Sequence, residues 1–233
     1  MSSGFDKNWI WRGDSLWFDR WQEVLFIQPK FVEIITWNDW GESHYVGPLD
    51  PTQYDTVFPQ GNATYNYVED FPHDGWRDLL PVFIDLYKKG TSLVNEELLV
   101  AWSRTGSGVL ADCSTNYTTG NTASQLQLEF PPGDVVQDYI FFAALIAGEV
   151  DPPQVNIGPD TVPSYWTTLP VNYPGVAFGN ASFAGYTGDW IVYVTRDEGM
   201  VEVMTVTGGS ITNSCQDGKQ CSLKTAFVCF FFR

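Results

Sequence analysis

Two carboxylates three residues apart, Asp39 and Glu42, lie in a short segment that also carries Asn38, His44 and Tyr45. Hydrolysis of a glycosidic bond requires one carboxylic acid that protonates the leaving oxygen and a second carboxylate that acts at the anomeric centre. The segment therefore predicts acid/base chemistry on a sugar, with Asp39 and Glu42 as the catalytic pair. The spacing alone would favour an ordinary alternative, in which both carboxylates accept hydrogen bonds from nearby turn amides.

The aromatic and polar neighbours of this pair are the candidates for binding a carbohydrate. Indole and phenol rings can stack on the apolar faces of sugar rings, and polar side chains can hydrogen-bond to their hydroxyl groups. The candidate binding residues are Trp37, Asn38, Trp40, His44, Tyr45 and, from a separate segment, His73. A single histidine is more often a structural group satisfied within the protein, so His44 and His73 depend most on their surroundings.

A buried strand over residues 31–37 is expected to position the pair. This run is rich in β-branched and aromatic residues and lies between Pro29 and Gly41, as is typical of a parallel strand covered on both faces. In α/β folds, the loops that leave the carboxyl ends of such strands carry the active site. Glu33 interrupts the apolar run, and we expect it to pair with a cation inside the fold.

Helices are predicted on both sides of this strand. Residues 14–28 have helical spacing of apolar residues, begin at a capping Asp14 or Ser15 and end before Pro29. Residues 74–89 form the second helix, which Gly90 closes and in which Pro81 predicts a kink or a late start. Residues 49–71 lie between them and are predicted to be a long irregular loop.

Short strands separated by turn residues are predicted after about residue 95, as in an all-β sandwich. The predicted strands are residues 98–103, 125–130, 139–147, 190–195 and 201–207. The proline-rich segment 152–174 is predicted to be an extended surface loop.

The sequence WNDWGESHYVGP, preceded by GDSLWFDRWQEVLFIQPKFVEIIT, resembles the carboxy-terminal part of the catalytic barrel of fungal α-1,3-glucanases (mutanases, glycoside hydrolase family 71). The resemblance runs from about Lys7 to Gly90 and rests on a long and unusual motif. It implies that Asp39 and Glu42 hydrolyse α-1,3-glucan with inversion of configuration and without a cofactor. We assign Glu42 as the acid and Asp39 as the base, and the reverse order remains open.

The predicted fold is therefore α/β plus all-β. Residues 1–92 are expected to form the last units of a (β/α)₈ barrel, and residues 93–233 a β-sandwich-like accessory domain that ends in an atypical stretch of roughly 15 residues. A complete barrel takes about 250 residues, so we expect the chain to be truncated at its amino end and inactive by itself. The alternatives are an inactive carbohydrate-binding fragment and a fragment without a stable fold.

The composition excludes several kinds of partner. A formal net charge of −16 disfavours binding to nucleic acid and to anionic membranes. We expect a monomer that binds a neutral polysaccharide and no metal, because no cysteine or histidine spacing resembles a zinc site. An aromatic content of 16% fits sugar binding, although large aromatic residues also fill ordinary cores.

Cysteines and sequons indicate a secreted glycoprotein, extracellular or in the cell wall. The four cysteines allow three disulfide connectivities, one of which closes the short loop between Cys215 and Cys221 and leaves Cys113 and Cys229. The sequons lie in polar, loop-like stretches at Asn62, Asn116 and Asn180. The first residues of this chain lack the apolar core of a signal peptide, so secretion is expected of the full-length protein.

Overall fold

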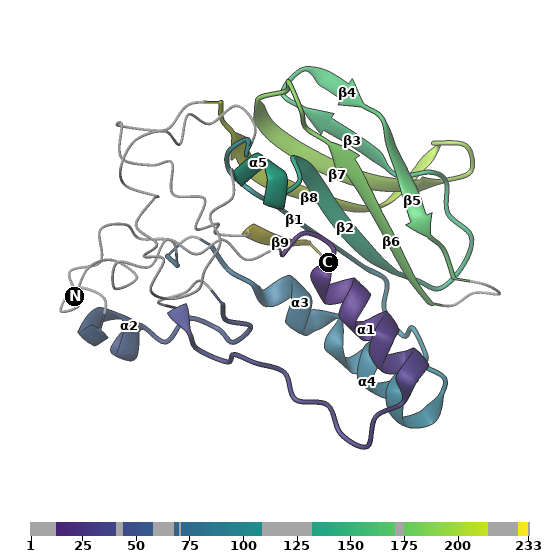
Figure 1. The fold of residues 1–233 in the computed structure, drawn as a ribbon. Coiled ribbons are helices and arrows are strands. Elements are labelled where there is room, and N and C mark those ends of the chain that lie inside the picture. Colours follow the sequence, from purple (N-terminus) through teal and green to yellow (C-terminus); the bar gives the residue numbers. More distant parts are fainter. Residues whose placement is uncertain are drawn as a thin grey trace.

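The structure is a computed structural model that describes residues 13–40, 44–57, 68–69, 71–108, 132–170, 175–213 and 228–232. In these ranges, a layer of helices packs on one of two facing β-sheets (Figure 1). The helices are α1 (Leu16–Ile27), α2 (Pro51–Val57), α3 (Asp74–Asp78), α4 (Leu80–Lys89) and α5 (Pro132–Val135).

Both sheets are antiparallel. The five-stranded sheet has the order β5-β6-β2-β1-β9, and the four-stranded sheet has the order β4-β3-β7-β8. The strands of the first sheet are β1 (Leu98–Ser103), β2 (Tyr139–Ile146), β5 (Ser164–Thr168), β6 (Gly175–Ser182) and β9 (Val228–Phe232). Those of the second are β3 (Gln154–Ile157), β4 (Asp160–Val162), β7 (Gly188–Arg196) and β8 (Val201–Ile211).

The two sheets face each other across an apolar core. Alternate residues of β7 point into this core, among them Trp190 and Val192, and they meet alternate residues of β2, among them Phe142 and Ile146. Strand β2 is apolar along nearly its whole length because its opposite face is buried as well. A strand covered on both faces has no water-facing positions, so it loses the usual alternation of apolar and polar residues.

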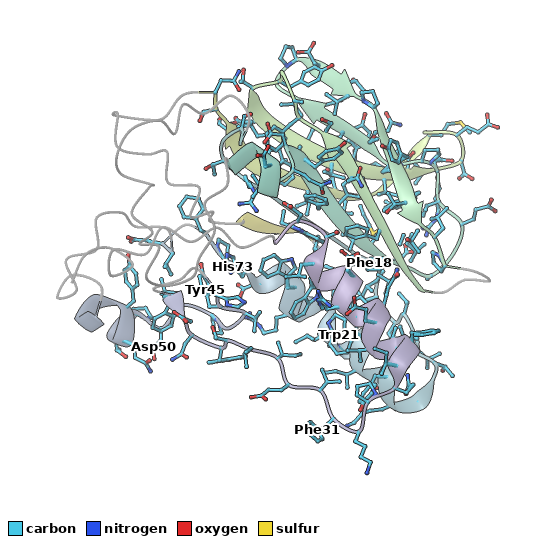
Figure 2. The ribbon with its side chains drawn as sticks, in the orientation of Figure 1. Phe18, Trp21, Phe31, Tyr45, Asp50 and His73 are labelled. Atoms are coloured by element: carbon cyan, nitrogen blue, oxygen red, sulfur yellow. The ribbon has the colours of Figure 1, made fainter. Side chains whose placement is uncertain are left out.

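Helices α1, α3 and α4 cover this opposite face of the five-stranded sheet (Figure 1). Phe18 of α1 stacks on Phe178 of β6, with ring centroids 4.5 Å apart, and Trp21 stacks on Phe83 of α4 at 5.2 Å. Figure 2 shows Phe18 turned towards the sheet and Trp21 between the helices. The predicted boundary near residue 92 thus lies between two parts that share one apolar core.

A buried ion pair joins the start of α1 to the end of β1. Arg104 lies with its Nη2 atom 3.4 Å from a carboxylate oxygen of Asp14, and the indole nitrogen of Trp102 donates a hydrogen bond of 2.7 Å to the Asp14 carbonyl. Burial lowers the pKa of Arg104 to about 10, while the carboxylate of Asp14 opposes that shift. The polar groups of Asp14 therefore link the helical layer to the sheet beneath it.

The predicted helices are confirmed. The first spans Leu16–Ile27 and ends at Gln28, whose φ of 52° lets its amide donate to the Val24 carbonyl at 2.9 Å. The second is broken at Leu79 into α3 and α4, with proline in the first turn of α4, as Pro81 predicts. Gly90 closes α4 with a φ of 72°. The predicted loop 49–71 is partly wrong, because it contains α2.

The predicted buried strand over residues 31–37 is wrong. The segment is extended, but within the described ranges it pairs with no strand. Phe31, Ile35 and Trp37 are 81%, 63% and 59% exposed, and Glu33 is also exposed rather than enclosed in a polar interior. A β-branched run forms a strand only when a neighbour accepts its backbone hydrogen bonds. No barrel is identified among the described residues, and the predicted barrel stays a prediction.

The predicted strands 98–103, 139–147, 190–195 and 201–207 coincide with β1, β2, β7 and β8. The predicted surface loop 152–174 is wrong, because it contains β3, β4 and β5. Strand β6 was not predicted, and it carries Asn180, so the loop expected at that sequon is wrong. The predicted strand 125–130 and the residues Asn62, Asn116, Cys113, Cys215 and Cys221 lie outside the described residues.

Candidate functional site

Thr36 holds together the loop that carries Asp39. Its hydroxyl oxygen accepts a hydrogen bond of 3.0 Å from the Asp39 amide, and the hydroxyl donates to the His44 carbonyl. The amide of His44 in turn donates to the Asp39 carbonyl at 3.0 Å. One small side chain thus connects both arms of the loop, and Asp39 and His44 lie opposite each other in a local antiparallel bridge.

Backbone hydrogen bonds extend this pairing to the base of the loop. The amide of Val46 donates to the Thr36 carbonyl at 3.0 Å, and the amide of Gly47 donates to the Trp37 carbonyl at 2.9 Å. A β-carbon at position 47 would lie 2.5 Å from the Trp37 carbonyl oxygen and 2.7 Å from its indole ring. Glycine is therefore required where the indole crosses the returning chain. We call residues 36–47 the motif loop.

The polar side of the motif loop is accessible. Trp37 and Asn38 are exposed, and Asp39 and His44 are partly exposed, so these four side chains can meet a ligand. Glu42, the second predicted catalytic carboxylate, lies outside the described residues. An exposed indole beside a carboxylate and an imidazole provides both a stacking surface and hydrogen-bonding groups.

The other predicted binding residues lie in the interior. Trp40, Tyr45 and His73 are 6%, 2% and 0% exposed, so the structure disfavours a direct contact of their side chains with a sugar. The hydroxyl of Tyr45 donates to the Phe71 carbonyl, and Trp40 packs with Tyr45 in a small cluster that includes Val68. These residues support the motif loop from beneath.

Helix α3 contacts the returning arm of the motif loop. The Nδ1 atom of His73 lies 2.7 Å from the Tyr45 carbonyl, and the guanidinium of Arg77 donates to the Val46 carbonyl at 2.9 Å. Because a carbonyl only accepts hydrogen bonds, Nδ1 of His73 carries the proton. The rings of Tyr45 and His73 stack with their centroids 4.0 Å apart. Figure 2 labels the two residues in the same region, beside α3.

A groove of about 410 Å³ borders the same loop. One wall is α1, through Trp17, Trp21 and Val24, and the other is the extended segment with Val32 and Ile34. The groove reaches His44 and Tyr45 at one end. Its apolar walls could accept rings or aliphatic side chains, and Phe31 points away from it into solvent (Figure 2).

Asp50, just after the motif loop, is the residue before helix α2 (Figure 2). The hydroxyl and the amide of Thr52 both donate to its carboxylate, at 2.6 and 2.9 Å. These hydrogen bonds favour the ionised form, so they lower the pKa of Asp50. Asp50 therefore acts as a helix cap that stays ionised at neutral pH.

Neither a metal site nor a membrane-spanning helix is found in the part of the chain that the structure describes. No group of three or more histidine, cysteine, aspartate or glutamate side chains there is placed to hold a metal ion. Within the same ranges, no helix has the length and apolar character that crossing a bilayer requires.

Sequence reasoning missed three residues that shape the site: Thr36, Gly47 and Arg77. Arg77 lies four residues after His73, in the first turn of the helix predicted over residues 74–89, and residues with this spacing are neighbours where a helix continues through both. This signal was available, whereas the contacts of Thr36 and Gly47 depend on the path of the motif loop and have no local signature.

A carboxylate, an imidazole and an exposed indole on one braced loop are typical of a carbohydrate-active site. The sequence profile of glycosyl hydrolase family 71 matches residues 1–222. The chain therefore belongs to this family, and the resemblance drawn from the motif is confirmed.

Curated relatives agree with this assignment. The chain is 37% identical over 138 residues to glucan endo-1,3-alpha-glucosidase agn1 of Schizosaccharomyces pombe, a match that covers 58% of this chain and 28% of the relative. It is 37% identical over 144 residues to mutanase Pc12g07500 of Penicillium rubens, covering 60% and 28%. It is 40% identical over 87 residues to the ascus wall endo-1,3-alpha-glucanase of Schizosaccharomyces pombe, covering 37% and 19%.

The chain thus spans less than a third of the length of these curated relatives. No solved structure matches it.

Proposed function

We propose that this chain forms part of the sugar-binding and catalytic region of an enzyme that hydrolyses α-1,3-glucan. The observation that carries the proposal is the braced motif loop, which leaves Asp39 partly exposed beside the exposed indole of Trp37 in a member of glycosyl hydrolase family 71. The names of the relatives, a glucan endo-1,3-alpha-glucosidase, a mutanase and an endo-1,3-alpha-glucanase, support the choice of substrate.

The proposed chemistry is acid/base hydrolysis with inversion. Glu42 protonates the glycosidic oxygen of the leaving sugar as the C–O bond breaks, and Asp39 removes a proton from the water that attacks the anomeric carbon. An inverting pair lies roughly 6.5–9.5 Å apart, which leaves room for that water. Asp39 and Glu42 are three residues apart in the sequence, and we propose that their carboxyl groups are held at such a separation.

The proposed sugar contacts come from the accessible side of the motif loop. The indole of Trp37 would stack on one glucose ring, while Asn38 and His44 hydrogen-bond to hydroxyl groups. Such contacts need neither a charged ligand nor a metal, which suits a neutral glucan and a protein with a net charge of −16. We also propose that the full-length protein is secreted to the cell wall, where this polymer occurs.

Two observations favour a second candidate, a glucan-binding fragment without hydrolytic activity. The matched region covers only 28% of the two relatives with the longest matches, and the segment before the motif loop exposes Phe31 and Ile35 to solvent. A catalytic centre assembled from several segments loses activity when some are missing, whereas an exposed indole can still stack on a sugar.

The test is to incubate the purified chain with insoluble α-1,3-glucan and to measure both soluble glucose oligomers and protein bound to the pellet. The variants are Asp39→Asn, Glu42→Gln and Trp37→Ala, with Asp160→Asn at the exposed start of β4 as the control. Hydrolysis that both carboxylate variants abolish supports the enzyme. Binding without hydrolysis, weakened by Trp37→Ala, supports the binding fragment. If the chain shows no hydrolysis and no binding, both proposals are overturned.

A further inference from the structure

Two successive carbonyl groups at the end of the motif loop are held by two side chains of one helical segment. His73 donates to the Tyr45 carbonyl at 2.7 Å, and Arg77 donates to the Val46 carbonyl at 2.9 Å. His73 is the N-cap residue of α3 and Arg77 lies inside the helix, and both side chains reach the chain at residues 45 and 46. We call these two residues the clamp.

Both members of the clamp are themselves fixed. His73 is fully buried between Tyr45, with ring centroids 4.0 Å apart, and Trp76, at 5.0 Å. The Nη2 atom of Arg77 lies 2.6 Å from the Asp74 carboxylate, while Nη1 donates a hydrogen bond to the Val46 carbonyl. A guanidinium can make both contacts at once because its donors form a planar fork, which a lysine lacks.

The clamp is anchored on the β-sheet. Trp76 packs edge-on against Trp102 of β1, with ring centroids 6.1 Å apart. The indole of Trp102 donates to the Asp14 carbonyl at 2.7 Å, at the start of α1. A continuous set of packed rings and hydrogen bonds therefore runs from the five-stranded sheet through α3 to the motif loop.

The carbonyls that the clamp holds adjoin the amides that close the motif loop. Tyr45 directly follows His44, whose amide bonds to the Asp39 carbonyl, and the amide of Val46 bonds to the Thr36 carbonyl. A displacement of Tyr45 or Val46 would therefore move Asp39 and His44. We propose that His73 and Arg77 are positioning residues that hold the motif loop in its binding geometry, with the β-sheet as their support. This inference rests on the proposed function for the importance of that geometry, but not for the contact itself.

Two substitutions at position 73 separate the hydrogen bond from the packing. His73→Phe keeps a ring stacked on Tyr45 but removes the donor, and His73→Asn keeps a donor at the place of Nδ1 but removes the ring. The readout is hydrogen exchange of the His44, Val46 and Gly47 amides, followed by NMR. We expect exchange in His73→Phe to be roughly tenfold faster at these amides, with strand β2 unchanged and with His73→Asn restoring most of the protection.

Arg77→Lys provides an independent test, because it retains the charge but replaces the two separate nitrogens that contact Val46 and Asp74 by a single one. We expect several-fold faster exchange at the Val46 and Gly47 amides. The matched control is Lys89→Gln on α4, which removes an exposed ion pair with Asp85 (2.9 Å) and should leave these amides unchanged. Unchanged exchange in both His73→Phe and Arg77→Lys overturns the proposal. Faster exchange in His73→Asn than in His73→Phe overturns it too, because packing rather than the donor would then hold the loop.

Binding to insoluble α-1,3-glucan distinguishes failure of this inference from failure of the proposed function. If the clamp positions the loop for sugar, His73→Phe weakens glucan binding several-fold and His73→Asn restores it, while the melting temperatures of the two variants do not follow that order. Exchange effects without any glucan binding by the unmodified chain would support the clamp and contradict the proposed function.

Discussion

Trp37 and Gly47 are in direct contact across the base of the motif loop. The amide of Gly47 donates to the Trp37 carbonyl at 2.9 Å, and a β-carbon at position 47 would lie 2.7 Å from the indole ring. Trp37 is nevertheless 59% exposed, so much of this residue stays accessible to solvent. The contact therefore fixes the indole while leaving its outer surface for a ligand.

Gly47→Ala should displace this indole. The added methyl group overlaps both the carbonyl oxygen and the ring of Trp37, so we expect a loss of about 1–3 kcal/mol in stability and weaker glucan binding. Equilibrium unfolding in urea and a pull-down on insoluble glucan measure the two effects. Gly148→Ala is the control, because a β-carbon there meets nothing within 4 Å. Equal behaviour of the two variants would contradict the assigned contact.

Thr36→Val should loosen the motif loop without changing its packing volume. Valine keeps the shape of threonine but lacks the hydroxyl, which accepts a hydrogen bond from the Asp39 amide and donates one to the His44 carbonyl. We expect a cost of about 1–3 kcal/mol, because two polar groups lose a partner. Thr36→Ser keeps the hydroxyl and should recover most of that stability. Denaturant titration compares them, and a serine variant as unstable as the valine variant would argue against the hydrogen bonds.

Much of the secondary structure could be predicted from the local pattern of apolar residues and from the prolines and glycines at the ends of elements. Pro29 and Pro81 limit α1, α3 and α4 because proline fixes φ and lacks an amide donor, and Gly90 closes α4 because glycine adopts its φ of 72° without steric cost. The strands that were found are apolar runs such as β2. Strand β6, with the sequence GVAFGNAS, was missed because its small residues have little strand propensity and the neighbouring strands stabilise it.

The site could be predicted in composition but not in arrangement. The motif gave Asp39, Trp37 and His44, all of which the structure leaves at least partly exposed. It could not show that His73 is buried under Tyr45, since burial depends on chain segments 28 residues apart. The strand expected over residues 31–37 failed for a related reason: a strand is a property of a pair of segments, and pairing partners cannot be read from one run.

The ion pair between Glu97 and Arg196 should make stability depend on acid pH. The carboxylate receives two hydrogen bonds from the guanidinium, at 2.5 and 3.0 Å, and these lower the pKa of Glu97 below its ordinary value near 4.5. Below that ordinary value the unfolded chain takes up a proton while the folded chain does not. The stabilisation is therefore complete above about pH 5 and is lost as the pH falls through the lowered pKa.

Glu97→Gln should remove this dependence. We expect the variant to be about 1 kcal/mol less stable than the unmodified chain at pH 7, because the partly buried pair joins the residue before β1 to the end of β7. This difference in stability should narrow towards pH 3. Melting temperatures at pH 7, 5, 4 and 3 measure the difference. The stability difference between Arg196→Gln and the unmodified chain should narrow over the same pH range. A gap that stays constant across these pH values would show that the charge of Glu97 is not responsible.

Removal of Arg104 should cost far more than removal of an exposed arginine. Arg104→Met leaves the buried carboxylate of Asp14 without its guanidinium, for which we expect a loss of about 3–5 kcal/mol. In the double variant Asp14→Asn, Arg104→Met, no buried charge is left at these two positions, so we expect it to be more stable than Arg104→Met alone. The matched control is Arg20→Met on α1, whose pair with Glu23 is exposed and should contribute less than about 1 kcal/mol. Urea unfolding of the four proteins provides the comparison. If the double variant is the least stable of all, the pair contributes net stability and the cost of burying its charges is smaller than we infer.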